Sequence, residues 1–286
     1  MGIKLSTSNY GKSRVRLVRI TRGSEQHHLK DVSLDIQFEG DFEDVHIHGD
    51  NRKVLPTDTM KNTVYALAGQ RPVGEIEEFG LRLADHFLAN NPPVRNVRVT
   101  LTERQWARIP VEGRPHPWAF VGGRPDKRTA MVAATRAGHS VQAGIDDLLV
   151  LKSQESAFEG YIQDRYTTLQ ETRDRIFATV VKANWSYGRE DVAFGRCWEG
   201  ARGVLLQTFA VHRSESVQHT LYAMAGAVLD AFGEIDAIRL SMPNKHHLPV
   251  DLEPFGMENN NEVFVATDEP YGLIEAVVRR DSGFQF

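Results

Sequence analysis

The residue types with the most evident chemistry lie near the end of the chain, at residues 241–247, which read SMPNKHH. The mostly apolar residues 237–240 (AIRL) precede them and predict a strand that Pro243 closes, because proline lacks the N–H that a sheet ladder needs. The segment carries one amide, one ammonium and two imidazoles, on Asn244, Lys245, His246 and His247. Such groups can donate, accept and transfer protons near neutral pH. The cluster is therefore either a functional site at a strand end or a solvated polar turn.

Another pair of imidazoles lies in the first half of the chain, on His46 and His48. Alternate residues of an extended segment point to the same side, so these two rings could bind zinc. His27–His28 and His246–His247 are further pairs that could supply ligands. Histidines at this spacing are more often solvated or hydrogen-bonded than bound to metal, and a measurement of bound metal distinguishes the two.

The composition is that of an ordinary globular protein. The 286 residues are 41% hydrophobic and 25% charged, which suits one large domain or two medium ones. The formal net charge of −4 leaves no basic excess for nucleic-acid phosphates. Residues 1–30 lack an apolar signal-peptide core, and no apolar run is long enough to span a membrane. The single cysteine, Cys197, fits a reducing compartment. From the charge and the lack of long apolar runs, we expect a soluble protein without nucleic-acid or membrane partners.

The first half of the chain predicts a hairpin, two helices and further strands. Residues 14–21 and 32–38 alternate polar with apolar side chains and should pair antiparallel. Thr57 or Asp58 can cap a helix with Met60, Val64 and Leu67 on one face. A second helix has its apolar face on Ile76, Phe79, Leu81, Leu83, Phe87 and Leu88, and the further strands are expected at residues 94–101, 118–121 and 130–134.

The second half repeats this order of elements. Residues 176–185 predict a strand, the apolar residues at 194, 198, 201, 205 and 209 form one helix face, and another helix begins near Glu215. The stretch TVYALAG at 63–69 recurs as TLYAMAG at 220–226, identical at five of seven positions. Chance similarity of two amphipathic helices is the alternative to an internal duplication. A duplication predicts two domains, residues 1–140 and 141–286, with a boundary near 137–145 between a loop and an acidic turn.

The repeat also places residues 57–58 opposite residues 214–215, so that each pair begins a helix. A helix start offers free N–H groups and a partial positive charge to an anionic or carbonyl-rich ligand. Each half is expected to leave a sheet incompletely covered, which favours association between subunits.

Five stretches together closely resemble motifs of the urate oxidase (uricase) family. They are residues 9–12 (NYGK), 56–63 (PTDTMKNT), 166–175 (YTTLQETRDR), 216–220 (SVQHT) and 243–246 (PNKH). They occur in the order that the family shows and span nearly the whole chain, whose length also matches. One stretch could arise by chance, whereas five in register make the resemblance specific.

The resemblance implies an α+β fold class, with two tandem tunnelling-fold domains whose antiparallel sheets carry helices on one face. It implies a homotetramer with a central tunnel and active sites between subunits. The implied reaction oxidises urate with O2 and water to 5-hydroxyisourate and hydrogen peroxide in purine degradation. The resemblance also implies that no metal or organic cofactor takes part and that O2 is a co-substrate.

The roles of the family's substrate-binding residues fall on matching positions of this sequence. The resemblance implies that Arg175 and Gln218 hold opposite edges of the planar urate anion, which suits a guanidinium fork and an amide. It implies that Phe158 stacks on the purine ring while Leu169 and Val217 form an apolar wall.

The remaining implied residues come from both halves of the chain. Thr57 and the backbone N–H of Asp58, from a second subunit, would meet the imidazole side of urate, which agrees with the helix start predicted there. Asn244 would contact the substrate and, with Thr57, hold O2 and later the attacking water. Lys12 and Thr57 would form a proton relay with His246 of the neighbouring chain, whereas Lys245 and His247 would have no role in catalysis.

Two other functions are weighed beside this one. A zinc-dependent tunnelling-fold enzyme of pterin or purine metabolism would use histidines such as His46 and His48. A non-catalytic purine-binding oligomer would keep the pocket without the relay, and the joint presence of Lys12, Thr57 and His246 argues against it.

The chain departs from part of the family at its end. Residues 282–286 read SGFQF, without the Ser-Lys-Leu address that peroxisomal members carry. We therefore expect a cytoplasmic, bacterial setting.

Overall fold

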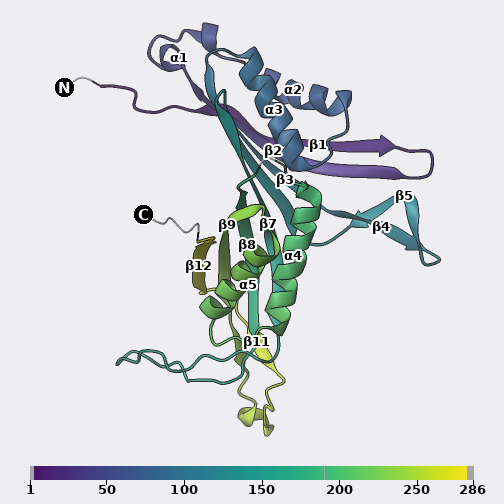
Figure 1. The fold of residues 1–286 in the computed structure, drawn as a ribbon. Helices are drawn as coiled ribbons and strands as arrows, with labels where there is room; N and C mark the ends of the chain where they lie inside the picture. Colours follow the sequence, from purple (N-terminus) through teal and green to yellow (C-terminus); the bar gives the residue numbers. More distant parts are fainter. Residues whose placement is uncertain (1–2, 190, 282–286) are drawn as a thin grey trace. The chain divides into compact units, whose positions relative to one another are not determined.

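The computed structural model describes residues 3–189 and 191–281 and divides into two compact units, Met1–Gly144 and Ile145–Phe286 (Figure 1). The tail at 282–286, where a peroxisomal address was looked for, lies outside the described residues. None of the helices in the described ranges combines the length and the hydropathy needed to cross a bilayer.

Unit 1 is an antiparallel sheet with two long helices packed against it. Its elements are β1 (Tyr10–Arg22), β2 (His27–Gly40), α1 (Glu43–Ile47), η1 (Asn51–Lys53), α2 (Thr57–Gln70), α3 (Ile76–Asn90), β3 (Val94–Arg104), β4 (Trp106–Val111), β5 (Arg114–Gly122), β6 (Lys127–Thr135) and the first part of β7 (Gly138–Lys152). The sheet order is β1-β2-β3-β6-β7, while β4 and β5 form a separate hairpin (Figure 1). Helix α2 contacts β1, and α3 contacts β3 and β6.

The core of unit 1 follows from the alternation of apolar residues. The register places Ile36 beside Val99 and Val99 beside Val132, so that buried side chains of three strands share one face. Gly80 of α3 packs on this face, since an added Cβ would lie 2.8 Å from Val132 Cγ2 and 3.0 Å from Leu101 Cδ1. The missing side chain therefore lets α3 approach the sheet closely.

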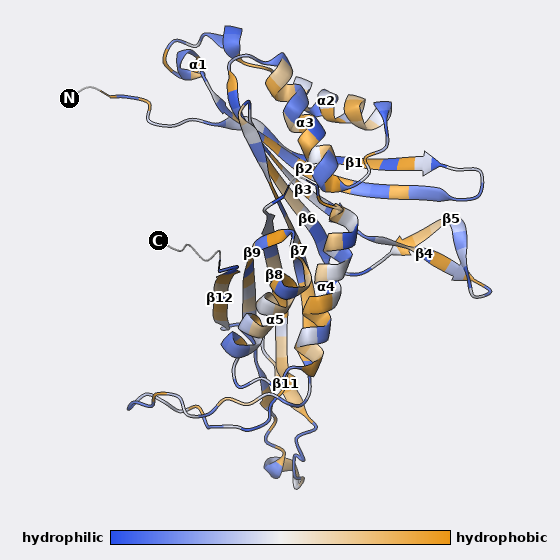
Figure 2. Cartoon of the chain, viewed as in Figure 1, coloured by the Kyte–Doolittle hydropathy of each residue, from blue (hydrophilic) through white to orange (hydrophobic). Residues whose placement is uncertain are grey.

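Unit 2 has the same order of layers. Its elements are the rest of β7, β8 (Phe177–Tyr187), α4 (Phe194–Val211), α5 (Val217–Ala231), β9 (Ile235–Lys245), β10 (His247–Pro249), η2 (Glu253–Phe255), β11 (Phe264–Ala266) and β12 (Gly272–Arg279). The sheet order is β7-β8-β9-β12, and α5 contacts α4, β9 and β12. Figure 2 shows hydrophobic and hydrophilic stretches alternating along α4, whose predicted apolar face is buried.

Most of the predicted elements are confirmed, with β7 as the main exception. The hairpin at 14–21 and 32–38, both helices of each half and the strands at 94–101, 130–134 and 176–185 are all present. The predicted loop at 136–139 ends inside β7, and the predicted acidic turn at 144–147 lies wholly within this strand. Asp147 has a φ of 61°, and the buried positions change from 141, 143 and 145 to 148 and 150 across it. The acidic pair therefore forms a bulge in a continuing strand, where turn-forming residues suggested a chain reversal.

Candidate functional site

Lys12 lies where the regular pairing of β1 with β2 is interrupted. Its Cα pairs with that of Ile36, and the register then shifts before Val15. Arg14, at the shift, has a φ of 56° and donates its backbone N–H to Asp35 Oδ1 at 2.6 Å. Gly11 precedes Lys12 because a Cβ there would lie 1.8 Å from the Ile36 carbonyl oxygen. A glycine and a bulge therefore fix the backbone on both sides of Lys12.

Tyr10 joins this strand to the segment before α2. Its hydroxyl accepts a hydrogen bond of 3.0 Å from the backbone N–H of Leu55, and burial raises the pKa of the phenol. The Tyr10 ring packs edge-on against Phe38 and Phe42, with centroid distances of 5.8 and 4.8 Å. The start of β1 and the start of α2 are therefore held together by one side chain.

Helix α2 begins at Thr57, but neither predicted cap is used. Pro56 is the N-cap residue without a side-chain hydrogen bond, and Thr57 and Asp58 are the first two helical residues. Proline fixes its own φ near the value that precedes a helix, and this leaves the Thr57 hydroxyl available for other contacts. The first N–H groups of the helix still lie where a ligand can reach them.

Asp58 is held by its own helix. Its carboxylate accepts from Lys61 Nζ at 2.5 Å and Asn62 Nδ2 at 3.0 Å. The hydrogen bond from Lys61 is the main cause that lowers the pKa of Asp58, and the charge of Lys12 contributes to the same shift. Unit 1 thus brings Lys12 within electrostatic range of the Thr57–Asp58 helix start.

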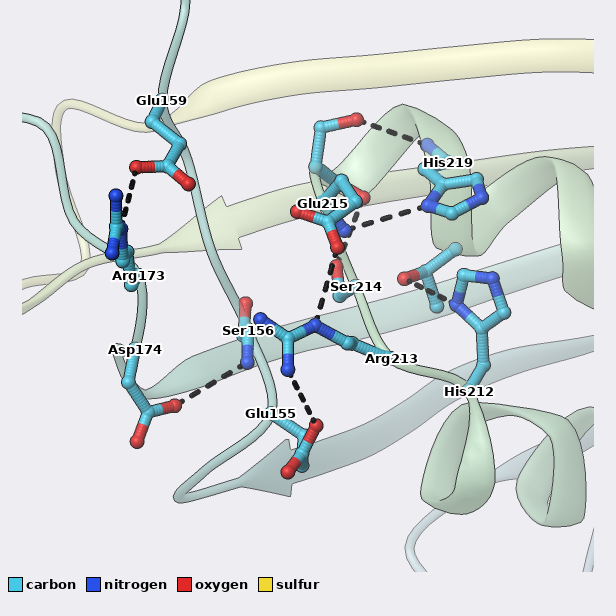
Figure 3. A network of polar contacts seen from close by, with 12 residues as sticks. Glu155, Ser156, Glu159, Arg173, Asp174, His212, Arg213, Ser214, Glu215 and His219 are labelled. Carbon is cyan, nitrogen blue, oxygen red and sulfur yellow. Dashed lines mark hydrogen bonds and ion pairs between the residues drawn. The ribbon is translucent and has the colours of Figure 1, made fainter.

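In unit 2, the segment at residues 155–159 carries Phe158 and contacts both the Arg175 stretch and the segment before α5. Ser156 and Ser214 form a parallel bridge, and Phe158 forms an antiparallel bridge with Thr172. Ala157 donates to the Ser214 carbonyl at 2.7 Å, and Arg175 donates its backbone N–H to the Ser156 carbonyl at 2.8 Å. Figure 3 shows the segment from Glu155 to Glu159 between the Arg173–Asp174 stretch and the Ser214–Glu215 stretch. Phe158, Arg175 and the start of α5 are therefore placed by one set of backbone bonds.

Arg175 and Phe158 lie side by side. The guanidinium carbon is 5.6 Å from the centre of the Phe158 ring, within the range of a cation–π contact. Burial lowers the pKa of Arg175, and its buried Nε has no hydrogen-bond partner among the described residues. A desolvated guanidinium with an unused donor is suited to binding an anion.

Tyr161 is a site neighbour that the sequence reasoning missed. Its ring stacks on Phe158 with centroids 4.8 Å apart and an interplanar angle of 15°. Its hydroxyl donates to the Leu169 carbonyl at 2.7 Å, while the Leu169 side chain is 58% exposed. Tyr161 therefore covers one face of Phe158 and ties Leu169 to it. An aromatic residue three positions after Phe158 was the signal available in the sequence.

Val217 and Gln218 form the first turn of α5. Ser216 is the N-cap, and its hydroxyl accepts from the His219 backbone N–H at 3.1 Å. Val217 is buried and Gln218 is exposed, so only the amide of this pair is open to solvent. Helix α5 starts two residues later than the predicted start at Ser214–Glu215, and Ser214 instead forms the bridge with Ser156.

The C-terminal cluster lies at the end of β9, two residues beyond the predicted strand end. Asn244 pairs with Thr179 of β8 and Gly272 of β12, so Pro243 does not close the strand. The described pairing of β8 with β9 skips Met242 and Pro243 and resumes at Asn244, which accommodates the missing N–H of proline. His246 follows β9 directly, and its carbonyl accepts from the Thr267 backbone N–H at 3.0 Å.

The two residues expected to have no role in catalysis have other contacts. Lys245 Nζ pairs with Asp268 Oδ1 at 2.6 Å, and His247 Nδ1 lies 3.2 Å from the Lys245 carbonyl oxygen. Both contacts stay within residues 245–268, between the end of β9 and the start of β12.

The histidines considered for zinc do not have the expected geometry. His46 lies in helix α1 and His48 is its C-cap residue, so the segment is not extended as predicted. Residues two apart on a helix do not face one another. Across residues 3–189 and 191–281, no three His, Cys, Asp or Glu side chains gather closely enough to hold a metal ion.

Comparison with known proteins identifies relatives over almost the full chain. A family model described as Uricase matches residues 8–133 and 141–275. The chain is 45% identical to a uricase of Arthrobacter globiformis over 98% of this chain and 91% of the relative, and 39% identical to one of Dictyostelium discoideum over 96% and 97%. The crystal structure of the Arthrobacter globiformis uricase matches with a TM-score of 0.94 at 44% identity, covering 100% of this chain and 98% of that one. This agreement confirms the expected α+β tunnelling fold.

Proposed function

Because the chain belongs to the uricase family and is a urate oxidase, we propose that it oxidises urate at a site built from the residues described above. The products are 5-hydroxyisourate and hydrogen peroxide, formed from one urate, one O2 and one water in purine degradation. Atoms and electrons balance in this reaction. The oxygen of water becomes the hydroxyl group on C5, and two electrons and two protons convert O2 to hydrogen peroxide.

The observation that carries the proposal is the Arg175–Phe158 pair. Tyr161 stacks on Phe158 and the Arg175 guanidinium lies over the same ring, so a flat anionic purine would meet an aromatic surface and a guanidinium together. The guanidinium beside that ring has a buried Nε without a partner in the described part of the chain. Gln218, on the first turn of α5, holds the opposite edge of urate, and Val217 and Leu169 enclose the ring.

The second half of the proposed site comes from a neighbouring subunit. Thr57 and the backbone N–H of Asp58 meet the imidazole side of urate, where the start of α2 favours negative charge. Four chains assemble as a homotetramer so that each site combines unit 1 of one chain with unit 2 of another. This proposal is supported by the division of the chain, since Lys12 and Thr57 lie in unit 1 and Arg175 and Gln218 lie in unit 2.

The proposed chemistry is proton transfer around an electron-rich substrate. Lys12, Thr57 and His246 relay protons away from urate, while Asn244 and Thr57 hold O2 and then the water that attacks C5. The urate dianion passes electrons to O2 directly, so the reaction proceeds without a metal or organic cofactor. The protein contributes orientation, proton transfer and exclusion of bulk water.

A spectroscopic assay under chelation tests the proposal. Protein treated with a chelator and analysed for bound metal is incubated with urate in air, while urate absorbance and peroxide are followed. We expect loss of urate with one peroxide per urate. No loss under chelation, or stoichiometric zinc whose removal abolishes the reaction, would contradict a cofactor-free urate oxidase.

A further inference from the structure

Two imidazoles meet directly beside the proposed substrate-binding turn. His212 follows the last turn of α4, and His219 lies next to Gln218 in the first turn of α5. Their rings make an edge contact with centroids 4.4 Å apart and an interplanar angle of 70° (Figure 3). Neither residue belongs to the substrate-binding set or the proton relay proposed above.

The hydrogen bond to His219 defines which ring nitrogen carries a proton. The backbone N–H of Glu215 points to His219 Nδ1 at 3.4 Å (Figure 3). A backbone N–H can only donate, so Nδ1 is an acceptor and carries no proton in this arrangement. The bond closes the loop from Glu215 through the Ser216 cap to His219, with Val217 and Gln218 inside it.

Protonation of His219 is incompatible with this loop. A proton on Nδ1 would face the Glu215 N–H donor and remove the only acceptor of that contact. The loop would then lose one hydrogen bond and gain a repulsion between two donors, which favours a different backbone for Val217 and Gln218.

Lys152 and Thr220 contact His212, the second imidazole of the pair. Lys152, from β7, donates to the His212 carbonyl at 2.6 Å, and His212 Nδ1 lies 3.2 Å from the Thr220 hydroxyl. Burial, then His219 and Lys152, lower the pKa of His212, so this ring favours its neutral form.

The nearby acidic side chains are already occupied. Arg213 Nε pairs with Glu215 at 3.2 Å, and Arg213 Nη1 pairs with Glu155 at 3.6 Å (Figure 3). Both carboxylates pair with Arg213, and the charge of Glu215 only partly opposes the lowering of the His212 pKa.

We propose that His219 is a positioning residue for the Val217–Gln218 turn, and that protonation of its ring weakens urate binding by releasing the Glu215 N–H. This inference rests on the proposed function, since Gln218 is the residue through which it reaches urate. His219 itself touches neither urate nor the relay, so the effect falls on KM and leaves kcat in place.

The test compares the pH dependence of KM in the full-length wild type and two variants. When KM is measured at a high and at a low pH, the wild-type value should be about fivefold larger at the low pH, as loss of one hydrogen bond predicts. His219→Asn keeps an acceptor near the Nδ1 position but does not titrate, so its KM should stay nearly flat. His219→Ala should have a raised KM at both pH values with kcat within about twofold of wild type. His139→Asn, at an exposed histidine in β7, is the control and should follow the wild type.

A second readout does not depend on turnover. The amide resonance of Glu215 should titrate with pH in the wild type and not in His219→Asn. Equal pH profiles of KM in wild type and His219→Asn, or a Glu215 amide insensitive to pH, would overturn the inference. Absence of urate oxidation in the wild type would instead contradict the proposed function, and the amide titration would still decide whether His219 controls the turn.

Discussion

Arg175 and Phe158 are linked twice, through their side chains and through the backbone. The guanidinium carbon lies 5.6 Å from the Phe158 ring centre, and the Arg175 N–H donates to the carbonyl of Ser156, two residues before Phe158. The proposed stacking platform and the proposed anion-binding fork are therefore held by the same backbone segment. A support of this kind keeps both groups at a fixed separation before a ligand arrives, which reduces the entropy lost on binding.

Removal of the fork should weaken binding more than turnover. Arg175→Ala deletes a charge-assisted contact of about 1.5–3 kcal/mol, so KM should rise by roughly ten- to a hundredfold, with a smaller change in kcat. Arg173→Ala is a matched control, because its side chain is 86% exposed and pairs only with Glu159 among the described ion pairs. Steady-state kinetics of both variants checks this, and equal KM values would contradict the role of Arg175.

Removal of the relay lysine should have the opposite signature. Lys12→Ala should lower kcat by about a hundred- to ten-thousandfold, the range of general acid–base catalysis, and change KM little. Lys53→Ala, a surface lysine paired with Asp41 and Asp44, should keep wild-type kinetics. Unchanged kcat in Lys12→Ala would mean that the relay assignment has to be abandoned.

Two glycine substitutions test the packing of unit 1. Gly80→Ala forces a Cβ to within 2.8 Å of Val132 Cγ2 and should destabilise the fold by about 1–3 kcal/mol. Gly69→Ala, in α2 with no atom within 4 Å of the added Cβ, should be neutral or stabilise by about 0.4–1 kcal/mol. Denaturant unfolding of both variants measures the difference, and equal midpoints would show that α3 does not need the close approach.

Acid should weaken unit 1 through Asp31. Burial tends to raise the pKa of this carboxyl, but hydrogen bonds from Arg16 and Trp106 outweigh it and leave the pKa below the ordinary 3.8. A lowered folded-state pKa gives stability that is present above 3.8 and is lost as the pH falls through the folded value. Asp31→Asn should therefore be less stable than wild type at about pH 6 and lose less on acidification.

Thermal unfolding at several pH values measures this effect. Asp230→Asn, at an exposed position of α5, should parallel the wild type. Curves for Asp31→Asn that run parallel to the wild type would show that the ion pair with Arg16 contributes no pH dependence.

Period-two and helical patterns predicted the elements whose burial is set by one uninterrupted face. The alternation in β2 and β3 and the face of α4 are such cases. These patterns failed where turn-forming residues or a proline lie inside a strand that continues to pair with its neighbours. Asp147 changes the phase of β7 without ending it, and Pro243 lies inside β9 because Asn244 pairs with both neighbouring strands.

The sequence predicted the residues of the candidate site and not the contacts that hold them in place. Arg175, Gln218 and Lys12 were predicted because each lies in a short stretch that resembles a family motif. The residues that hold them are marked only by contacts between distant segments. Tyr10 reaches Leu55, and Ala157 donates its backbone N–H to the Ser214 carbonyl. A single sequence carries no periodicity for such contacts.

The claim that each site is shared by two chains is tested most directly with mixed oligomers. Lys12→Ala and Arg175→Ala chains are expressed together, with each variant alone as the reference. If Lys12 of one chain serves the site that contains Arg175 of its neighbour, random mixing yields about a quarter of sites with both wild-type halves. Activity should then return to about a quarter of the wild-type value at low urate concentration. Mixed oligomers no more active than the two variants alone would contradict a shared site, because both residues would then act within one chain.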